Sequence, residues 1–317
     1  AANTTGNANT AVGQGAADGL TTGSGNVAVG ANALGASTTA GENVAVGNGA
    51  MASSTSASGC VAIGDNAFGG AVTTGANSVA IGNNAGYATT SGASNVLIGY
   101  ASGDAITTGG SSTGVGYNSL TAVTTGANNT SVGYNAGNNI TTGGNSTMVG
   151  FSVSASAGDG ANQICLGNSI TCPGDDQVAI GKSSNFVHNT FTSDATWSRT
   201  SDERIKRNIQ DDSLGLNFIN ALKTKTYQWK PSNEVPEELT FCYNKNNQMD
   251  LDVVMHGLIA QEVKEALDAE GVDTFGGWSV LKDGSQQVSR EMFVIPLIKA
   301  VQQLSAEVES LKAQLEE

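Results

Sequence analysis

The sequence predicts a mostly β protein in two parts: a rod built as a repetitive parallel β-solenoid, then an α+β domain that ends in a coiled-coil helix. Three observations predict this. A 17-residue repeat runs through the first part, 36 of the 42 glycines lie in residues 1–200, and the last thirty residues carry an apolar heptad pattern. We therefore place the rod at 1–182, a connector at 183–200 and the second domain at 201–317, with the heptad helix at 289–317.

The repeat of the first part is anchored by a glycine that closes a short β-branched run. A typical run is Val27-Ala28-Val29, in which two β-branched residues flank a small one. Because alternate residues of a strand share a face, we expect each run to form a strand whose β-branched pair lies in the core. The anchoring glycines are Gly13, Gly30, Gly47, Gly64, Gly82, Gly99, Gly116, Gly133, Gly150, Gly167 and Gly181.

A 17-residue repeat suits one coil of two short strands and two turns, with glycines at corners that need positive φ. About ten coils that each rise ~4.8 Å give a rod of roughly 50 Å. Two β-branched residues and one alanine make a thin core, so we expect the rod to complete its core against copies of itself. The motif N-x-V-A-I-G-x-x-A is similar to the repeat of the β-roll heads of trimeric autotransporter adhesins, over about residues 4–182, although that family usually has a shorter period.

Two columns of the repeat invite a functional interpretation. Paired threonines such as Thr21-Thr22 precede most strands and resemble the arrayed threonines of ice-binding solenoids. Tyr100, Tyr117, Tyr134 and Phe151 follow the anchoring glycine in four successive coils and could form a sugar-binding strip. We favour structural roles for both, as corner-filling residues and as rings that stack on one another, and predict no enzymatic activity for the rod.

Composition and charge exclude several classes of partner. The net charge is −14, and both parts are acidic, which argues against nucleic acid and anionic membranes. No apolar run approaches the ~18 residues of a membrane-spanning helix. Cys60, Cys165, Cys172 and Cys242 form no C-x-x-C pair, and the chain has only two histidines. We therefore expect no metal and no other cofactor, and we expect all four cysteines to be small buried apolar residues.

Residues 201–317 show mixed helical and strand patterns. Apolar spacing predicts a short helix over 214–222, and alternation predicts a strand over 225–230. An amphipathic pattern predicts a helix over 257–267 that stops near Gly271.

The final element carries apolar residues in strict steps of three and four, which indicates an oligomerisation helix entered near Pro296. Valine at a and leucine at d favour two strands over three, so the heptads alone leave the copy number open. The heptad residues are Val294, Leu297, Val301, Leu304, Val308, Leu311 and Leu315.

Motifs in a fixed order run through this part. Ser201–Ile209 reads S-D-x-R-x-K-x-x-I, Tyr227-x-Trp229 follows, Gly257–Val263 reads G-L-I-A-Q-E-V, and the heptads close the chain. Together they make residues 201–317 resemble the chaperone-of-endosialidase family, which comprises self-cleaving intramolecular chaperones at the carboxy termini of phage tail fibres and tailspikes. The resemblance implies a homotrimer that assists folding of the preceding fibre and cuts the Thr200–Ser201 bond.

The chemistry of that cut can also be argued from the residues. Ser201 directly follows the scissile carbonyl, so its Oγ can attack Thr200 through a five-membered ring without a substrate pocket. A serine needs a base, and a lysine can serve if burial lowers its pKa, which makes Lys206 the general base of a Ser-Lys dyad. Because residues five apart do not face each other on a helix, we expect Ser201 to precede the turn that carries Lys206. His256 is an alternative base.

Asp202 and Arg204 are expected to be structural. The sequence thus predicts the distal part of a phage tail fibre or tailspike, with a single-turnover autoproteolytic serine endopeptidase at its end. The expected partners are copies of itself, a host cell-surface receptor that includes glycans among the candidates, and other tail proteins; the expected location is the virion tail, assembled in the host cytoplasm. The alternatives are a bacterial trimeric surface adhesin and an ice- or glycan-binding solenoid.

Overall fold

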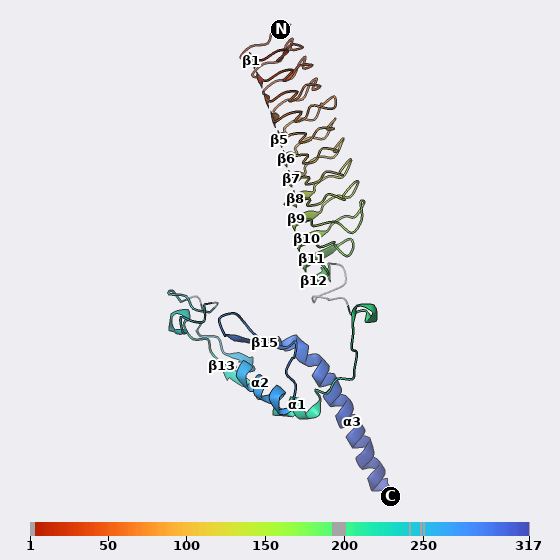
Figure 1. The fold of residues 1–317 in the computed structure, drawn as a ribbon, viewed down its shortest axis with the longest axis vertical. Coiled ribbons are helices and arrows are strands. Elements are labelled where there is room, and N and C mark those ends of the chain that lie inside the picture. The colour runs from red at the N-terminus through yellow and green to blue at the C-terminus, as the bar shows by residue number, and fades with distance from the viewer. Residues whose placement is uncertain (1–3, 192–200, 241, 248, 250, 317) are drawn as a thin grey trace. The chain divides into compact units, whose positions relative to one another are not determined.

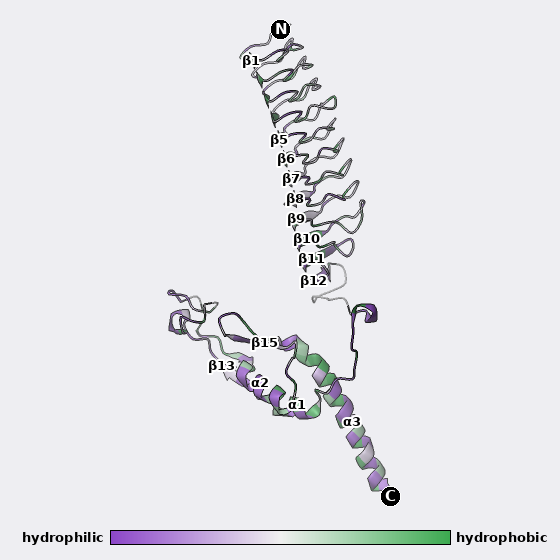
Figure 2. Ribbon diagram, in the orientation of Figure 1, coloured by the Kyte–Doolittle hydropathy of each residue, from purple (hydrophilic) through white to green (hydrophobic). Residues whose placement is uncertain are grey.

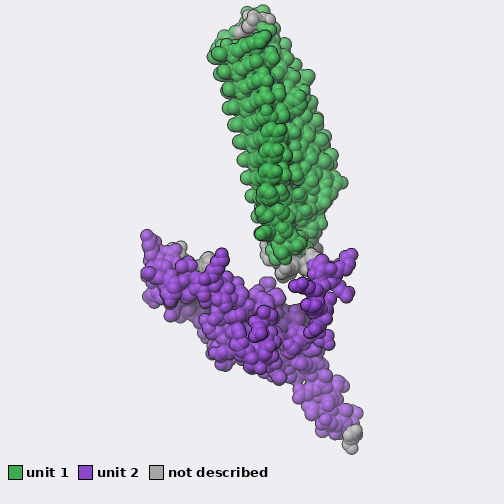
Figure 3. All heavy atoms as spheres, viewed as in Figure 1, with its two compact units in different colours: residues 1–201 green, residues 202–317 purple. Residues whose placement is uncertain are grey.

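The computed structural model describes residues 4–191, 201–240, 242–247, 249 and 251–316, and it divides into two compact units, Ala1–Ser201 and Asp202–Glu317 (Figure 3). We call them the rod unit and the C-terminal unit. The rod unit is a parallel β-solenoid, and the C-terminal unit is a small α+β fold with a long final helix. The predicted fold class is confirmed.

The described coils of the rod unit contribute one strand each to a single sheet along one side, with the turns on the other side (Figure 1). The register advances by 17 residues at most steps, as in Val27↔Val44, by 18 from Val61 to Val79 and by 14 from Ile164 to Val178. The rest of each coil is turns and bends, which corrects the expectation of two strands per coil. The parallel strands are β1 Thr10–Val12, β2 Val27–Val29, β3 Val44–Val46, β4 Val61–Ile63, β5 Val79–Ile81, β6 Val96–Ile98, β7 Thr113–Val115, β8 Thr130–Val132, β9 Thr147–Phe151, β10 Ile164–Asn168 and β11 Gln177–Lys182.

From β2 to β11 the two faces of the strands are reversed relative to the prediction. Middle residues such as Ala28 and Ala45 are fully buried, whereas the flanking side chains lie on the outer face and are only partly buried, as with Ile63 at 38% exposure. In most coils this position takes a small residue because larger side chains from the turns fill the interior, whereas in β6 and β9 the middle residues Leu97 and Met148 are themselves large and fully buried. The larger side chains from the turns are Leu20, Leu34, Met51, Phe68, Ile106, Leu120 and Ile140. The β-branched residues therefore form an outward apolar face.

A column of buried polar side chains joins successive coils. Asn43 Nδ2 donates to Asn26 Oδ1 at 3.1 Å and to the Ala57 carbonyl at 2.9 Å, while Asn43 Oδ1 accepts from the Cys60 N–H at 2.9 Å. Because a buried amide without a partner costs about 1–3 kcal/mol, these bonds hold neighbouring coils in one register. The column continues through Ser78, Asn95, Ser112, Asn129, Ser146 and Gln163, each bonded to the coil before it or after it.

The glycine that ends each strand is required by the close approach of the next coil. Gly82 has φ +135°, and a Cβ on it would lie 2.3 Å from the Gly99 carbonyl oxygen. A residue with a side chain would be strained there and would also clash with backbone. This explains why the repeat keeps glycine at this position.

The last parallel strand is covered by an antiparallel one. β12 Asn185–Thr190 pairs with β11, and Phe186 packs against the buried core of the rod unit. An uncovered edge strand is a template for unwanted pairing, so this hairpin acts as an end cap. β12 lies in the segment predicted as a connector; residues 192–200 of that segment lie outside the described residues.

The C-terminal unit surrounds a small aromatic core. Phe218, Phe275 and Phe293 are in contact, with ring centroids 5.1–6.0 Å apart, and Val263 and Leu267 pack against them. Two antiparallel strand pairs, β13 with β14 and β15 with β16, lie within this unit. Its elements are η1 Glu203–Ile205, α1 Leu216–Ala221, β13 Lys225–Tyr227, η2 Ser232–Glu234, β14 Met255–Gly257, α2 Ala260–Ala269, β15 Trp278–Val280, β16 Gln286–Val288, η3 Arg290–Phe293 and α3 Val294–Glu316.

The predicted elements of this unit are found with changed boundaries. The strand expected over 225–230 ends at Tyr227, and the helix expected over 214–222 spans Leu216–Ala221. The helix expected from Gly257 begins at Ala260, because Gly257 pairs with Lys225 between β14 and β13. Gly271, with φ +68°, follows the end of α2 as expected.

The helix α3 leaves its heptad residues in solvent. They are between 41% and 87% exposed, whereas Pro296 and Ala300 are the buried residues of α3 within its described part. Pro296 lies in the first turn, where no backbone N–H is needed, as the sequence predicts. Hydrophobic residues recur along α3 among hydrophilic ones (Figure 2). The helix therefore carries an apolar stripe that the C-terminal unit does not cover.

Candidate functional site

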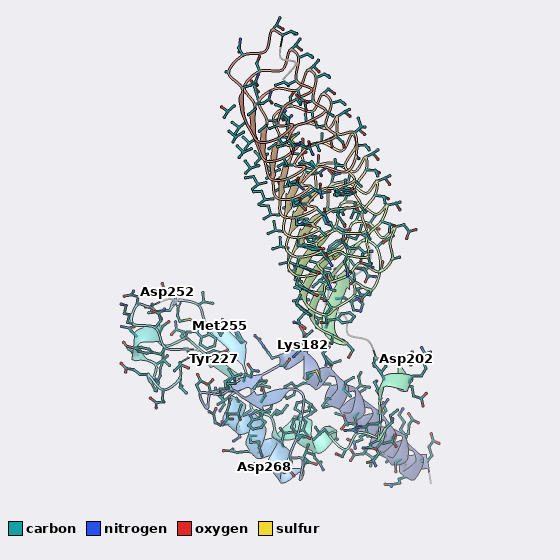
Figure 4. All side chains as sticks on the ribbon, turned by 45° about the horizontal axis from the view of Figure 1, so that its top comes forward. Lys182, Asp202, Tyr227, Asp252, Met255 and Asp268 are labelled. Carbon is teal, nitrogen blue, oxygen red and sulfur yellow. The ribbon has the colours of Figure 1, made fainter. Side chains whose placement is uncertain are left out.

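The first residues of the C-terminal unit form a single 3-10 turn with an acidic cap. Asp202 (labelled in Figure 4) precedes η1, and its carboxylate accepts from the Arg204 backbone N–H at 2.9 Å and from the guanidinium at 2.7 and 2.9 Å. The hydrogen bonds from Arg204 lower the pKa of Asp202, and the same pair raises the pKa of Arg204. Both residues therefore shape the turn, which is the structural role expected of them.

The two residues predicted to be catalytic flank this turn in the sequence. Ser201 stands before Asp202 in non-helical backbone. Lys206 ends the turn with φ −108° and ψ 153°, and its N–H donates to the Glu203 carbonyl at 3.0 Å. Ser201 therefore precedes the turn that carries Lys206, as expected. Thr200, on the other side of the predicted scissile bond, lies outside the described residues.

The segment around Lys206 is exposed throughout. Every residue from 203 to 213 is exposed, and the apolar side chains of Ile205 and Ile209 are 66% and 61% exposed. A lysine that acts as a general base near neutral pH needs burial or neighbouring cations. The described part of a single chain therefore presents the motif without the burial that this chemistry requires.

The Tyr227-x-Trp229 motif and the motif that begins at Gly257 pack against each other through the paired strands β13 and β14. Tyr227 on β13 is opposite Met255 on β14, as Figure 4 shows, and its ring lies edge-on to Trp229 with centroids 5.4 Å apart. A Cβ on Gly257 would lie 3.3 Å from the Tyr227 ring, so glycine lets this ring pack against the strand. These motifs therefore build the scaffold of the C-terminal unit.

His256 lies beside an open groove of about 700 Å³ in the C-terminal unit. Its backbone carbonyl accepts from Arg290 Nη1 at 3.2 Å, and its side chain is exposed. The apolar lining includes Phe293 and the heptad residue Leu297, so the groove is continuous with the exposed stripe of α3. The role of His256 as an alternative base stays a prediction.

The first threonine of the pairs uses its hydroxyl within the rod unit. Thr107 Oγ1 donates to the Thr124 carbonyl at 3.0 Å, and Thr124 Oγ1 donates to the Thr141 carbonyl at 3.2 Å. A hydroxyl proton that is bonded to the next coil is not offered to ice or to another ligand. This geometry supports the structural interpretation of the column.

The aromatic column is a continuous stack. Successive rings from Tyr100 to Phe151 have centroids 5.1–5.2 Å apart and planes within 9° of parallel. Each ring face between two neighbours is therefore covered by another ring, whereas a sugar that binds by stacking needs a free face. The ring edges and the tyrosine hydroxyls are what the column presents to solvent.

The cysteines are buried with one exception. Cys60, Cys165 and Cys172 are buried as expected, but Cys242 is exposed, which corrects the prediction for that residue. Burial raises the pKa of the Cys60 thiol, and a hydrogen bond with Cys172 raises the pKa of Cys165. Among the described residues, no three His, Cys, Asp or Glu side chains are placed to hold a metal ion. No helix within the described ranges is both long and apolar enough to cross a membrane.

The C-terminal unit matches the model of a known protein family. The family model of the chaperone of endosialidase, Peptidase S74, matches residues 201–272, from the predicted catalytic serine to three residues beyond α2. Neither the curated proteins nor the solved structures compared with the chain gave a match. The match describes a peptidase-related, self-cleaving chaperone domain, and beside a β-solenoid rod it fits a tail-fibre-like protein.

Proposed function

We propose that the chain is the distal part of a bacteriophage tail fibre or tailspike whose C-terminal domain trimerises the chain, assists its folding and then cuts itself off. One observation carries this proposal: the solenoid unit ends where the family match begins, at residue 201. A self-cleaving domain placed there separates the rod, capped by its own β12, from the segment that helped it to fold.

Two exposed apolar surfaces support a homotrimer. The heptad stripe of α3 is the surface that a coiled coil buries, and the outward β-branched face of the rod extends along β1–β11. Exposed apolar patches of this extent mark association surfaces in soluble proteins. The number three comes from the family resemblance, because valine at a and leucine at d do not select it.

The proposed cleavage is an acyl transfer followed by hydrolysis. Lys206 removes the proton from Ser201 Oγ, which attacks the Thr200 carbonyl carbon, and the amide nitrogen of Ser201 leaves as an amine that takes up the proton. The intermediate is an ester between Thr200 and Ser201 Oγ. Water then hydrolyses this ester, leaving a carboxylate on Thr200 and a free amino terminus on Ser201.

A folding template solves a problem that the repeat creates. Identical strands can pair one coil out of step, and long-range parallel pairing is slow. A helical end that associates quickly would align the chains before the rods form. Cleavage would then leave the assembled rods kinetically trapped.

The proposed partners follow from this placement in a tail fibre. They are a host cell-surface receptor, with glycans among the candidate ligands, and other tail proteins. The proposed location is the virion tail, after assembly in the host cytoplasm.

The proposal predicts cleavage that depends on two side chains. Intact mass measurement of the purified wild-type chain should give fragments of 200 and 117 residues, whereas Ser201→Ala and Lys206→Ala should stay at 317 residues. Arg207→Ala, which removes an exposed basic residue next to Lys206, is the matched control and should cleave normally. Cleavage that persists in both variants would contradict the assignment of Ser201 and Lys206 as the catalytic dyad. A wild-type chain that stays uncleaved would contradict the proposed self-cleavage.

A further inference from the structure

Two columns of exposed residues flank the outward apolar face of the rod unit. On one side stands the residue after the strand glycine, which is aromatic in four coils and 45–50% exposed. On the other side stands the residue two positions before the strand, which is exposed in the same coils and has φ between 56° and 59°. The aromatic column is Tyr100, Tyr117, Tyr134 and Phe151, and the polar column beside the same strands is Ser94, Ser111, Asn128 and Asn145.

We propose that, in the homotrimer, the aromatic column of each rod packs against the polar column of the next rod. This contact is heterologous, because two different surfaces meet, and a threefold axis closes it into a ring. The inference rests on the proposed trimer and adds which surfaces of the rod touch.

Charge complementarity distinguishes this contact from one between like columns. In the last parallel strand the aromatic column is continued by Lys182, labelled in Figure 4, and the polar column by Asp176. A heterologous contact brings the lysine of one copy to the aspartate of the next. A contact between like columns would instead bring lysine to lysine, which costs free energy.

The spacing of the rings also indicates that the partner of the aromatic column is a second rod. The ring centroids repeat every 5.1–5.2 Å over four coils, so a partner that contacts all four rings must repeat at nearly the same distance. A parallel stack of strands does so at ~4.8 Å. Aligned copies place Tyr117 level with Ser111 of the next copy, because both residues flank β7. The phenol groups can then donate to serine and asparagine oxygens.

The packing of the rings argues for contact at their edges. Inner ring faces are already covered by neighbouring rings, so the exposed part of the inner residues Tyr117 and Tyr134 is the ring edge and the hydroxyl. A column of short polar residues such as Ser111 and Asn128 offers room for those edges. A flat aromatic or bulky apolar surface would not satisfy the hydroxyls.

Crosslinking tests which columns touch. The full chain with Cys242→Ser, Tyr117→Cys and Ser111→Cys would be treated with a bis-maleimide about as long as a tyrosine side chain, alongside Tyr134→Cys with Asn128→Cys as a second pair. Each pair should give covalent trimers of the rod on a denaturing gel. Tyr117→Cys with Thr108→Cys, an exposed residue of the preceding coil's turn, is the control and should give none.

The possible outcomes test the contact between the columns separately from the proposed trimer. Crosslinked dimers from Tyr117→Cys alone would show that like columns meet and would overturn the proposal. Trimers by native mass with no crosslinks in either pair would also overturn it, while leaving the proposed trimer intact. A monomeric native mass of the unmodified protein would contradict both the proposed trimer and the contact between the columns.

Discussion

Asn43 shows how a single side chain holds coils of the rod together. Replacing it with alanine leaves the buried Ala57 carbonyl and the Cys60 N–H without their hydrogen bonds. Each unsatisfied group costs about 1–3 kcal/mol, so we expect Asn43→Ala to lower the free energy of unfolding by at least about 2 kcal/mol. Chemical denaturation followed by circular dichroism measures this.

Thr125→Ala is the control for that variant, because Thr125 occupies an exposed corner of the same solenoid. Exposed substitutions usually change stability by no more than about 0.5 kcal/mol. If the two variants lose equal stability, the buried amide column does not fix the register.

The burial of the cysteines was predicted from residue type alone, and this prediction is confirmed for Cys60, Cys165 and Cys172. Cys60 stands 17 residues after Asn43, at the same position of the next coil, and both residues are buried. Cys242 has no repeat around it, and its residue type alone led to a wrong prediction. The burial preference of a residue type is an average over many environments, so it does not tell whether a particular cysteine is buried.

At the scale of elements, the antiparallel strand β12 is expected to stabilise only the end of the rod. Phe186 on β12 packs against the core beneath β11, so Phe186→Ser should loosen the end of the rod. In a solenoid each coil contacts mainly its neighbours, and the damage should therefore stay local. Hydrogen exchange should show faster exchange in β10 and β11 and unchanged exchange in β2–β6.

Phe191→Ser is the matched control, since Phe191 is 51% exposed. It should leave exchange in β10 and β11 unchanged. Faster exchange along the whole rod in Phe186→Ser would contradict the view that β12 protects only the end.

The strands could be predicted from the sequence, but their faces could not. Alternation in Val27-Ala28-Val29 shows that two faces differ without showing which one is inside. Hydrophobicity favoured the valines, but Ala28 is inside because larger turn residues such as Leu34 leave room only for a small side chain. The start of α2 was missed for a similar reason: only pairing in space shows that Gly257 belongs to a strand.

At the scale of the whole molecule, the candidate site is incomplete within one chain. The order of motifs located Ser201 and Lys206 in the sequence, and the family match begins at that serine. The surroundings that would activate Lys206 were not predictable, because the segment 203–213 is exposed in the single chain. The copies proposed to cover the exposed stripe of α3 are also the proposed source of that burial, which would make cleavage depend on assembly.

The most direct test disrupts assembly without touching the motif. Leu304→Glu with Leu311→Glu puts charges into the heptad stripe, whereas Ala306→Glu with Ala313→Glu puts the same charges on the opposite side of α3. Native and denaturing mass should show the heptad variant monomeric and uncleaved at Thr200–Ser201, and the control trimeric and cleaved. Efficient cleavage by the monomeric heptad variant would contradict the claim that the active site is completed by assembly.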